Sequence, residues 1–300
     1  MGTFCKQTIK NNMISVSMIV KNEESCLAKC LESVRGADEI VIIDTGSTDK
    51  TIEIAKKYTD KVFEGKEFMW RDDFAYHRNQ SLERCTGEWI LIIDADETLE
   101  EGGIDKIRAL LPDIKKNCVY MKVISTSGDM NHGIRLFRSG KGIHWQEPAH
   151  NVLSERDGDY LDVTITYGYS AAHNLDPDRT LRILSKAVKD KPTPRRLYYL
   201  AREYWYRKDY GKACQMYDRY LRVAHWPPEM ADAHLMKARC LWHRQKGQDA
   251  RRACMEAIFI NPDFKEALSF MAEMHYEPMK TAWSRYAETA TNKNVIFIRQ

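Results

Sequence analysis

A short apolar run that ends in two acidic residues constrains the fold of this 300-residue chain more than any other feature. The run Trp89–Ile93 is followed at once by Asp94-Ala95-Asp96. An apolar stretch of this length is typical of a buried strand. A parallel strand delivers the residues after it to the carboxyl edge of the sheet, where α/β proteins bind their ligands. The sequence therefore predicts that Asp94 and Asp96 lie at a ligand-binding edge.

The two carboxylates would repel each other at this edge unless a cation lay between them. A divalent ion held by a few carboxylates and by phosphate oxygens meets that demand. Asp94 and Asp96 are therefore candidate ligands of Mn²⁺ or Mg²⁺ bound to a diphosphate. The alternative is a polar loop whose acids are solvated, and a lone Asp-x-Asp favours that alternative. The motifs described below favour the metal site over the solvated loop.

Residues 14–100 alternate between strand-like and helix-like patterns. Strands are expected at 14–20, 39–43 and 61–63 and before Asp94, with helices at 25–34, 51–58 and 73–85. Strands that alternate with helices at this spacing imply βαβ units and a mostly parallel sheet. Ser47 or Thr48 is expected to cap the second of these helices.

Beyond residue 100 the pattern changes twice. Residues 118–125 and 133–138 predict two strands, paired as a hairpin that extends the sheet. Residues 143–173 are expected to be irregular, with alternating apolar positions at 161–165. From Asp176 onward the chain is helical, with Asp176 as a cap and Pro177 at the first helical position. These boundaries predict a tail at 1–13, an α/β domain at 14–175, an all-α domain at 176–290 and a tail at 291–300.

The helical part contains a repeat. Ala213 and Ala250 occupy equivalent small-residue positions 37 residues apart, and a partial third unit begins at Lys265. The expected packing positions of the first two units are Leu197, Leu200, Ala201, Tyr204, Tyr217, Tyr220, Ala238, Leu241, Cys254 and Ala257. This pattern resembles tetratricopeptide repeats, which bury their faces by stacking. Its tyrosines serve either core packing or a concave recognition surface, and the repeats allow oligomerisation.

Composition limits the classes of function. Apolar residues make up 43% of the chain and charged residues 30%, with a net charge of +3, so nothing global demands nucleic acid or a membrane. The eight cysteines form no CxxC pair, which indicates reduced core thiols of a cytosolic protein. The first twelve residues lack the apolar region of a secretory signal, and no apolar stretch approaches the roughly 20 residues that span a bilayer. We expect a soluble, cytoplasmic protein.

Three motifs stand in order, each at the end of an expected strand. They are residues 17–24 (SMIVKNEE), 42–49 (IIDTGSTD) and 89–97 (WILIIDADE). Together they resemble the family-2 glycosyltransferases, and the resemblance covers residues 14 to about 175. It implies a GT-A nucleotide-sugar-binding domain, with a Rossmann-like and mostly parallel sheet, followed by the helical repeat domain.

The resemblance also implies roles for residues of these motifs. Asp44 would read the nucleoside, and Val20, Asn22, Glu23 and Ala95 would line the donor pocket, in part through backbone groups. Asp94 and Asp96 would hold the metal, which neutralises the charge that develops on the leaving nucleoside diphosphate. Related enzymes often return a histidine to the metal near the end of this domain, a position that His173 occupies here; a structural histidine is the alternative.

A fourth stretch, Trp70–Asn79, resembles the (W)xxDFxxxRN pattern of one branch of the family. That branch includes lipopolysaccharide-core glucosyltransferases and peptide S-glycosyltransferases. Arg78 and Asn79 are carried over as donor-pocket residues, because the planar donors of an arginine fit a diphosphate. The alternative for Arg78 is a surface position on a helix.

Sugar transfer needs a base for the acceptor's proton. Relatives often supply a carboxylate in a His-Glu pair, but here Asn151 follows His150 where that acid is expected. Glu147 or His150 is therefore the candidate base. Asp96, as a metal ligand, is the other candidate catalytic residue. Trp145 suits a wall for sugar stacking, and a core position fits it equally well.

These residues predict a metal-dependent inverting glycosyltransferase that uses a nucleotide sugar, with UDP expected, on a protein, peptide or saccharide acceptor. Inversion is implied by the resemblance. A nucleotidyltransferase would carry a Gly-rich, arginine-containing loop at residues 21–24, which read KNEE. A non-catalytic tetratricopeptide adaptor and transfer to a hydroxylated base in DNA also fit the sequence. Transfer to DNA is suggested by Arg195, Arg196, Arg202, Arg207, Arg239, Arg244, Arg251 and Arg252.

Overall fold

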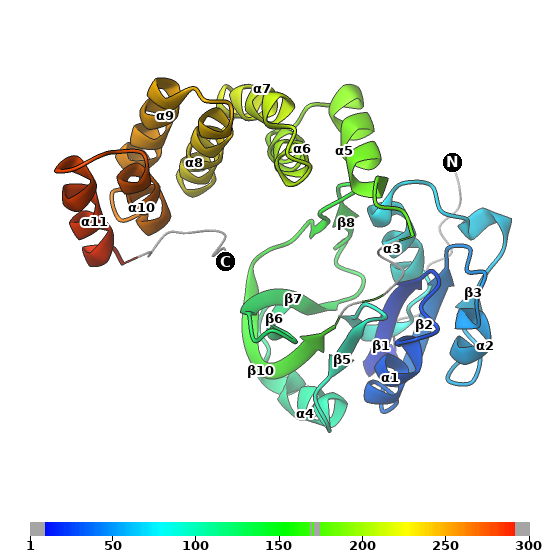
Figure 1. Cartoon of the computed structure of the whole chain (residues 1–300). Coiled ribbons are helices and arrows are strands. Elements are labelled where there is room, and N and C mark those ends of the chain that lie inside the picture. The colour runs from blue at the N-terminus through cyan, green and yellow to red at the C-terminus, as the bar shows by residue number, and fades with distance from the viewer. Residues whose placement is uncertain (1–9, 169, 171–174, 292–300) are drawn as a thin grey trace. The chain divides into compact units, whose positions relative to one another are not determined.

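A computed structural model describes residues 10–168, 170 and 175–291 (Figure 1). The chain divides into two compact units, Met1–Arg179 and Thr180–Gln300. The first unit is built around a β-sheet and the second from helices, as the sequence predicts.

The first unit holds an eight-stranded sheet with the strand order β3-β2-β1-β4-β7-β6-β10-β5. Its strands are β1 (Lys10–Val20), β2 (Glu39–Asp44), β3 (Val62–Phe63), β4 (Gly87–Ile92), β5 (Glu97–Leu99), β6 (Cys118–Ser125), β7 (Met130–Arg138) and β10 (Gly158–Tyr167). The neighbours β3, β2, β1 and β4 are parallel. β6 and β7 form the expected antiparallel hairpin, and β7 joins it to β4. The mostly parallel sheet is therefore confirmed in the half that carries the motifs.

Helices cover both faces of this sheet. They are α1 (Leu27–Ser33), α2 (Thr51–Ala55), α3 (Phe74–Leu82) and α4 (Gly103–Leu110), with 3₁₀ turns η1 (Lys66–Phe68) and η2 (Leu111–Asp113). Alternate residues of each buried strand face opposite sides. On one side the core joins the sheet to α1, α2 and α4; on the other, a smaller core includes Leu82 of α3 and Leu153 of the short hairpin β8 (Trp145–Gln146) and β9 (Val152–Leu153).

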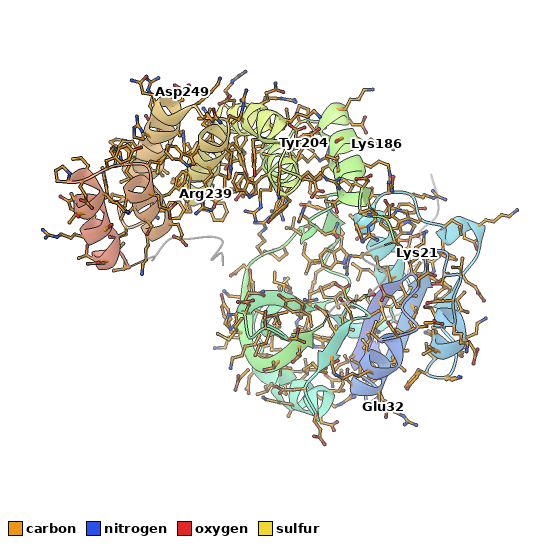
Figure 2. All side chains as sticks on the ribbon, viewed as in Figure 1. Lys21, Glu32, Lys186, Tyr204, Arg239 and Asp249 are labelled. Carbon is orange, nitrogen blue, oxygen red and sulfur yellow. The ribbon has the colours of Figure 1, made fainter. Side chains whose placement is uncertain are left out.

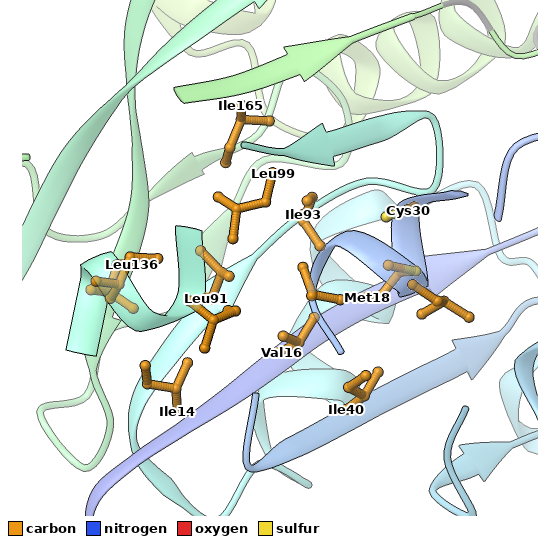
Figure 3. Close-up of a cluster of buried hydrophobic side chains, with 14 of the residues drawn as sticks. Ile14, Val16, Met18, Cys30, Ile40, Leu91, Ile93, Leu99, Leu136 and Ile165 are labelled. Atoms are coloured by element: carbon orange, nitrogen blue, oxygen red, sulfur yellow. The ribbon is translucent and has the colours of Figure 1, made fainter. Parts of the chain in front are cut away.

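The sheet curls back on itself. β4 ends at Ile92 and β5 begins at Glu97, yet three strands separate them in the sheet. Four inter-strand spacings of about 4.8 Å would place β5 roughly 19 Å from β4 in a flat sheet. The connecting chain, fully extended, reaches only about 18 Å. Curling removes the conflict and encloses Ile93, Leu99 and Ile165 in one core (Figure 3).

Three expectations from the sequence were wrong in detail. Residues 158–167 are not irregular but form β10, because Val163 and Ile165 bury one face against β6 and β5. Neither Ser47 nor Thr48 caps α2, since both bond to the turn after β1 and Lys50 precedes the helix. The helix after Pro177 begins at Arg179, two residues later than expected.

The described part of the second unit consists of α5 (Arg179–Asp190), whose first residue belongs to the first unit, and three helix pairs. The pairs are α6 (Pro194–Tyr206) with α7 (Tyr210–Leu221), α8 (Pro227–His243) with α9 (Gly247–Ile260), and α10 (Lys265–Glu273) with α11 (Met279–Thr289). Each pair packs together, and consecutive pairs pack through α7 on α8 and α9 on α10. The small residues Ala213 and Ala250 are fully buried, as the repeat predicts, and of the ten expected packing positions only Tyr204 is not buried.

Two further observations concern the described residues. None of their helices is long and apolar enough to cross a membrane. All seven cysteines among them are free thiols, and six of these are buried, which confirms the predicted core role within this part of the chain.

Candidate active site

The turns after β1 and β2 interlock at the carboxyl edge of the sheet. The backbone N–H of Asn22 donates to the Ser47 hydroxyl (2.9 Å), and the N–H of Glu23 donates to the Thr51 hydroxyl (2.7 Å). In return, the Asn22 side chain accepts a hydrogen bond from the backbone of Thr48 (2.8 Å). The parallel strands β1, β2 and β4 therefore bring their three motifs to one edge, as the sequence predicts.

A cavity of about 280 Å³ opens at this edge. It is lined by Ile19, Val20, Lys21, Glu23, Thr45, Trp70, Phe74, Arg78, Asp94, Ala95, Asp96, Glu97, Tyr167 and Arg179. Three cationic side chains thus meet four carboxylates around one space. Lys21 is labelled in Figure 2, just beyond the end of β1. A lining with charges of both signs suits a ligand that brings an anion and a cation together.

Two arginines hold the Asp94-Ala95-Asp96 turn. Arg78 of α3 pairs with Asp94, with Nη2 2.7 Å from Oδ1. Arg135 of β7 binds both carboxylate oxygens of Glu97, at 2.5 and 2.9 Å. The backbone N–H of Asp94 donates to the same Glu97 carboxylate at 2.8 Å. The turn is therefore fixed from both sides by charged groups that come from other elements.

The environment of Glu97 shifts its titration. Burial raises the pKa of the Glu97 carboxyl to about 7, and the nearby Asp94 carboxylate adds to the shift. Arg135 acts in the opposite direction and favours the charged form. A buried carboxylate needs such a partner, because an unpaired buried charge is costly.

Two thiols of α1 and its N-terminal turn lie beneath the same site. Cys30 donates to the backbone oxygen of Asp94 (3.3 Å), and Cys26 donates to the Glu23 carboxylate (3.2 Å). Burial raises the pKa of Cys26 to about 12 and that of Cys30 well above its ordinary value, and neighbouring carboxylates add to both shifts. Both thiols stay protonated at neutral pH, which makes them poor nucleophiles.

The residues at this edge fit a divalent cation in one specific way. No group of three or more His, Cys, Asp or Glu side chains is arranged to hold a metal within residues 10–168, 170 and 175–291. Asp94 and Asp96 nevertheless line the same cavity with oxygen ligands. Mg²⁺ is commonly bound by one or two carboxylates together with substrate phosphates, so this pair fits a metal that arrives with a diphosphate. The predicted third ligand, His173, lies outside the described residues.

Asp44, the last residue of β2, is not part of the lining of this cavity. Its carboxylate accepts hydrogen bonds from the backbone N–H groups of Gly46 and Ser47, both at 3.0 Å, and it is 3% exposed. Gly46 has a φ of +102°, a backbone conformation that residues with a Cβ rarely adopt, so this turn favours glycine. Asp44 thus shapes the turn that presents Thr45 to the cavity.

Asn79 binds the backbone of Trp145 and is likewise not part of the lining of this cavity. Its amide donates to the oxygen of Trp145 (3.0 Å) and accepts from the nitrogen of the same residue (2.7 Å). Asp73 caps α3 by accepting from the backbone of Tyr76 (2.9 Å), so the helix that carries Arg78 and Asn79 begins one residue later than predicted. Through Asn79, this helix anchors β8.

The two candidate bases lie between β8 and β9. Glu147 is half-buried and His150 is exposed, and both have a left-handed backbone, with φ of +71° and +50°. Non-glycine residues rarely adopt this conformation, which is often found at functional sites. Asn151 donates its side-chain N–H to the backbone oxygen of Glu147, which fixes the turn.

A second cavity of about 450 Å³ shares a wall with the first. Arg78 and Asp94 line both cavities, while Glu97 lines only the first and Arg135 only the second. The two ion pairs therefore form the partition between the cavities.

Sequence patterns did not reveal several residues of the site. Lys21 lines the first cavity, and Arg179 packs over Trp70 and Phe74, 5.9 and 5.0 Å from their ring centres. Glu97 belongs to a motif that the sequence singled out, but its partner Arg135 lies 38 residues further along the chain. The signal for Lys21 was its place directly after the first strand.

The family assignment follows from comparison with known proteins. The model of the family described as Glycosyl transferase family 2 matches residues 15–172, more than half of the chain. The chain therefore belongs to glycosyl transferase family 2, which confirms the resemblance.

Three curated relatives are similar over part of this chain. A TPR repeat-containing protein of Synechococcus elongatus is 35% identical over 146 residues, covering 47% of this chain and 36% of that protein. The prophage-derived glycosyltransferase SunS of Bacillus subtilis is 31% identical over 206 residues, covering 63% and 49%. The lipopolysaccharide core biosynthesis glycosyltransferase LpsC of Rhizobium meliloti is 39% identical over 104 residues, covering 34% and 36%. The chain thus spans half or less of the length of each relative.

Proposed function

We propose that this protein is a metal-dependent glycosyltransferase that moves a sugar from a nucleotide-sugar donor, with UDP as the expected nucleotide, to an acceptor hydroxyl or thiol. One observation carries the proposal. Asp94 and Asp96 line a cavity at the carboxyl edge of the parallel strands, together with the cations Lys21, Arg78 and Arg179. This arrangement suits the diphosphate of such a donor, and the family membership agrees with it.

Asp94 and Asp96 would hold Mn²⁺ or Mg²⁺. When bound, the metal would offset the negative charge that develops on the departing nucleoside diphosphate. Lys21 and Arg179, which line the same cavity, would bind diphosphate oxygens. For Lys21, the described part of the chain offers no carboxylate within ion-pair distance, so its ammonium is available to an anion.

The transfer itself exchanges one bond for another. The acceptor nucleophile forms a bond to the anomeric carbon, and the bond from that carbon to the diphosphate oxygen breaks. The electron pair of the broken bond leaves with the diphosphate. Glu147 or His150 would take the acceptor proton, and attack from the side opposite the leaving group would invert the anomeric centre.

The strained turn supports a base between β8 and β9. Both candidates stand in left-handed conformations, and Asn151, held to the backbone of Glu147, lines the second cavity. An uncharged amide at 151 cannot take a proton, so we assign the role of base to the carboxylate of Glu147 or the imidazole of His150, although neither residue is part of the lining of either cavity.

The acceptor and the role of the helical unit belong to the same proposal. Stacked helix pairs commonly bind extended peptides or partner proteins. The three pairs observed here would bind a protein or peptide that carries or presents the acceptor, or a second copy of the chain. A saccharide acceptor fits the second cavity of the first unit.

The test compares the binding of UDP and Mn²⁺ in matched variants. Wild-type protein should be stabilised against thermal unfolding by UDP with Mn²⁺, and far less by UDP with EDTA. The Asp96→Asn variant should lose most of the thermal stabilisation that depends on Mn²⁺. Asp105→Asn, an exposed acid on α4, should behave as wild type. Hydrolysis of UDP-glucose or UDP-N-acetylglucosamine should likewise be similar in wild type and Asp105→Asn and much slower in Asp96→Asn.

The adaptor alternative makes the opposite prediction. A non-catalytic protein would show no Mn²⁺-dependent binding of UDP and no turnover of a panel of nucleotide sugars. If Asp96→Asn hydrolysed the donor at the full rate, the protein would still be an enzyme, but Asp96 would not have the proposed role as a metal ligand.

A further inference from the structure

The second cavity adjoins the proposed donor site. It meets the first cavity at Asp94 and Arg78, and it is bordered by β6, β7, the β8–β9 hairpin and the loop before β10. Its volume of about 450 Å³ falls within the range of small-molecule sites, roughly 300–1,000 Å³. A molecule bound there would approach the donor across the ion-pair partition.

The charges of the second cavity do not balance. Arg78 pairs with Asp94 and Arg135 with Glu97, so these two guanidinium groups are compensated. Arg156 is exposed at the cavity, and no carboxylate of the described residues lies within ion-pair distance of its guanidinium. One cation is therefore left over for a ligand.

The backbone of Arg156 is also held in place. The Tyr120 hydroxyl donates to the backbone oxygen of Arg156 at 2.7 Å, and the Tyr120 ring stacks on that of Tyr160 at 5.0 Å. Glu155 accepts from the backbone N–H groups of Arg156 and Asp157, at 2.8 and 2.9 Å, which closes the turn. A fixed backbone lowers the entropy lost when the side chain binds an anion.

The lining of the second cavity also includes a fixed aromatic side chain. Trp145 lines the cavity, its backbone is held by both polar atoms of Asn79, and Arg78 lies 4.9 Å from its ring centre. Tyr120 adds a second ring to the lining. Rigid aromatic surface beside a few polar groups suits the apolar face of a sugar ring better than a flexible peptide.

We infer that the second cavity is the acceptor pocket and that it takes a saccharide carrying a carboxylate or phosphate group, which Arg156 binds. The inference rests on the proposed function, because it assumes a donor in the first cavity. The acceptor hydroxyl would bond to the anomeric carbon as the diphosphate leaves with its electron pair, and its proton would pass to Glu147 or His150. The charged group of the acceptor takes no part in this exchange and serves recognition.

The experiment measures binding of small probes to the full chain without donor. The probes are methyl β-glucoside, methyl β-glucuronide and glucose 6-phosphate, followed by saturation-transfer NMR at 150 mM NaCl. At least one charged probe should bind about tenfold more tightly than the glucoside. Arg156→Gln should reduce that difference to less than twofold. Arg35→Gln, an exposed arginine on the loop after α1, should leave it unchanged.

Each result decides the inference. Equal binding of neutral and charged probes, no binding of any charged probe, or an undiminished preference in Arg156→Gln would overturn it. Preference for a glutamate-rich hexapeptide over both charged sugars would overturn it in favour of a peptide site. Stabilisation by UDP with Mn²⁺, measured in the same variants, reports separately on the proposed function and should be the same in Arg156→Gln as in wild type.

Discussion

Arg135 binds both carboxylate oxygens of Glu97, and this same carboxylate accepts the backbone N–H of Asp94. The arginine lies on β7, whose register against β4 pairs Leu136 with Leu91. A residue far along the chain thereby fixes the backbone of the first acid in the proposed metal-binding turn. The Glu97 side chain is 5% exposed and that of Arg135 17%, so little water can replace either partner.

Removal of one partner of this pair should destabilise the protein strongly. Arg135→Met leaves the buried Glu97 carboxyl without its cation; because the pKa of this carboxyl is already about 7, it should take up a proton, and we expect the free energy of unfolding to fall by roughly 1–3 kcal/mol in urea titrations. Arg135→Met combined with Glu97→Gln should recover most of the loss, because the amide can still accept from Asp94. Arg108→Met breaks a more exposed pair with Asp38 and should cost about 1 kcal/mol or less. Equal losses in the two single variants would contradict the importance of burial.

Lys21 should contribute to donor affinity. Lys21→Met removes an ammonium group from the first cavity. We expect the dissociation constant for UDP with Mn²⁺ to rise about tenfold, which corresponds to a loss of roughly 1.4 kcal/mol of binding free energy. Isothermal titration calorimetry measures this directly. Lys29→Met, at an exposed position of α1, is the matched control. Unchanged affinity in Lys21→Met would remove this residue from the donor site.

Glu39 should make stability depend on pH below neutrality. Burial raises the pKa of its carboxyl, but hydrogen bonds from Lys61, Ser15 and Thr86 outweigh burial and hold the pKa below its ordinary value of 4.5. A group whose pKa is lower in the folded state stabilises fully above its unfolded pKa, and this stabilisation is lost as pH falls through the folded value. We expect the urea midpoint to fall as the pH drops below about 4.5. The urea midpoint should fall less steeply with pH in Glu39→Gln. An equally steep fall would show that other carboxylates cause the pH dependence.

The helical unit contains its own buried charge pair. Asp232 of α8 accepts from the Tyr198 hydroxyl and lies 3.8 Å from Arg202 of α6, and both charged side chains are less than 10% exposed. Asp232→Ala should therefore lower the free energy of unfolding by roughly 3–5 kcal/mol, followed by circular dichroism at the helical band. Asp218→Ala breaks a more exposed pair with Lys237 and should cost about 1 kcal/mol or less. A small effect of Asp232→Ala would show that water reaches the pair.

Local sequence was sufficient for the strands that carry the motifs and for the helix pairs. Continuous apolar runs locate β1, β2 and β4, and their parallel order follows from the helices between them. β10 was expected to be irregular although its positions 161–165 alternate, because only Val163 and Ile165 of this strand are buried and it lacks a continuous apolar run. β5 has only three residues and no pattern of its own.

The site could be predicted only where one motif supplies it. Asp94 and Asp96 lie at the expected edge, and Arg78 reaches Asp94 because capping by Asp73 starts its helix at the right place. Asp44 was expected to read the nucleoside, which stays a prediction; in the structure its carboxylate accepts the backbone N–H groups of Gly46 and Ser47. Arg135 and Arg156 join the site through strand register and loop anchoring, which no single segment of sequence encodes.

All three motifs lie before residue 98, but the curled sheet that shapes their edge is completed only by β10. Among the described strands, β5, which directly follows the Asp94-Ala95-Asp96 turn, pairs with β10 alone. A fragment that stopped at Arg138 would keep all three motifs and the Trp70–Asn79 stretch, yet β5 would have no strand to pair with. Possession of the motifs is therefore a poor guide to competence in truncated or fused versions of this domain, and the last strand is the part to preserve.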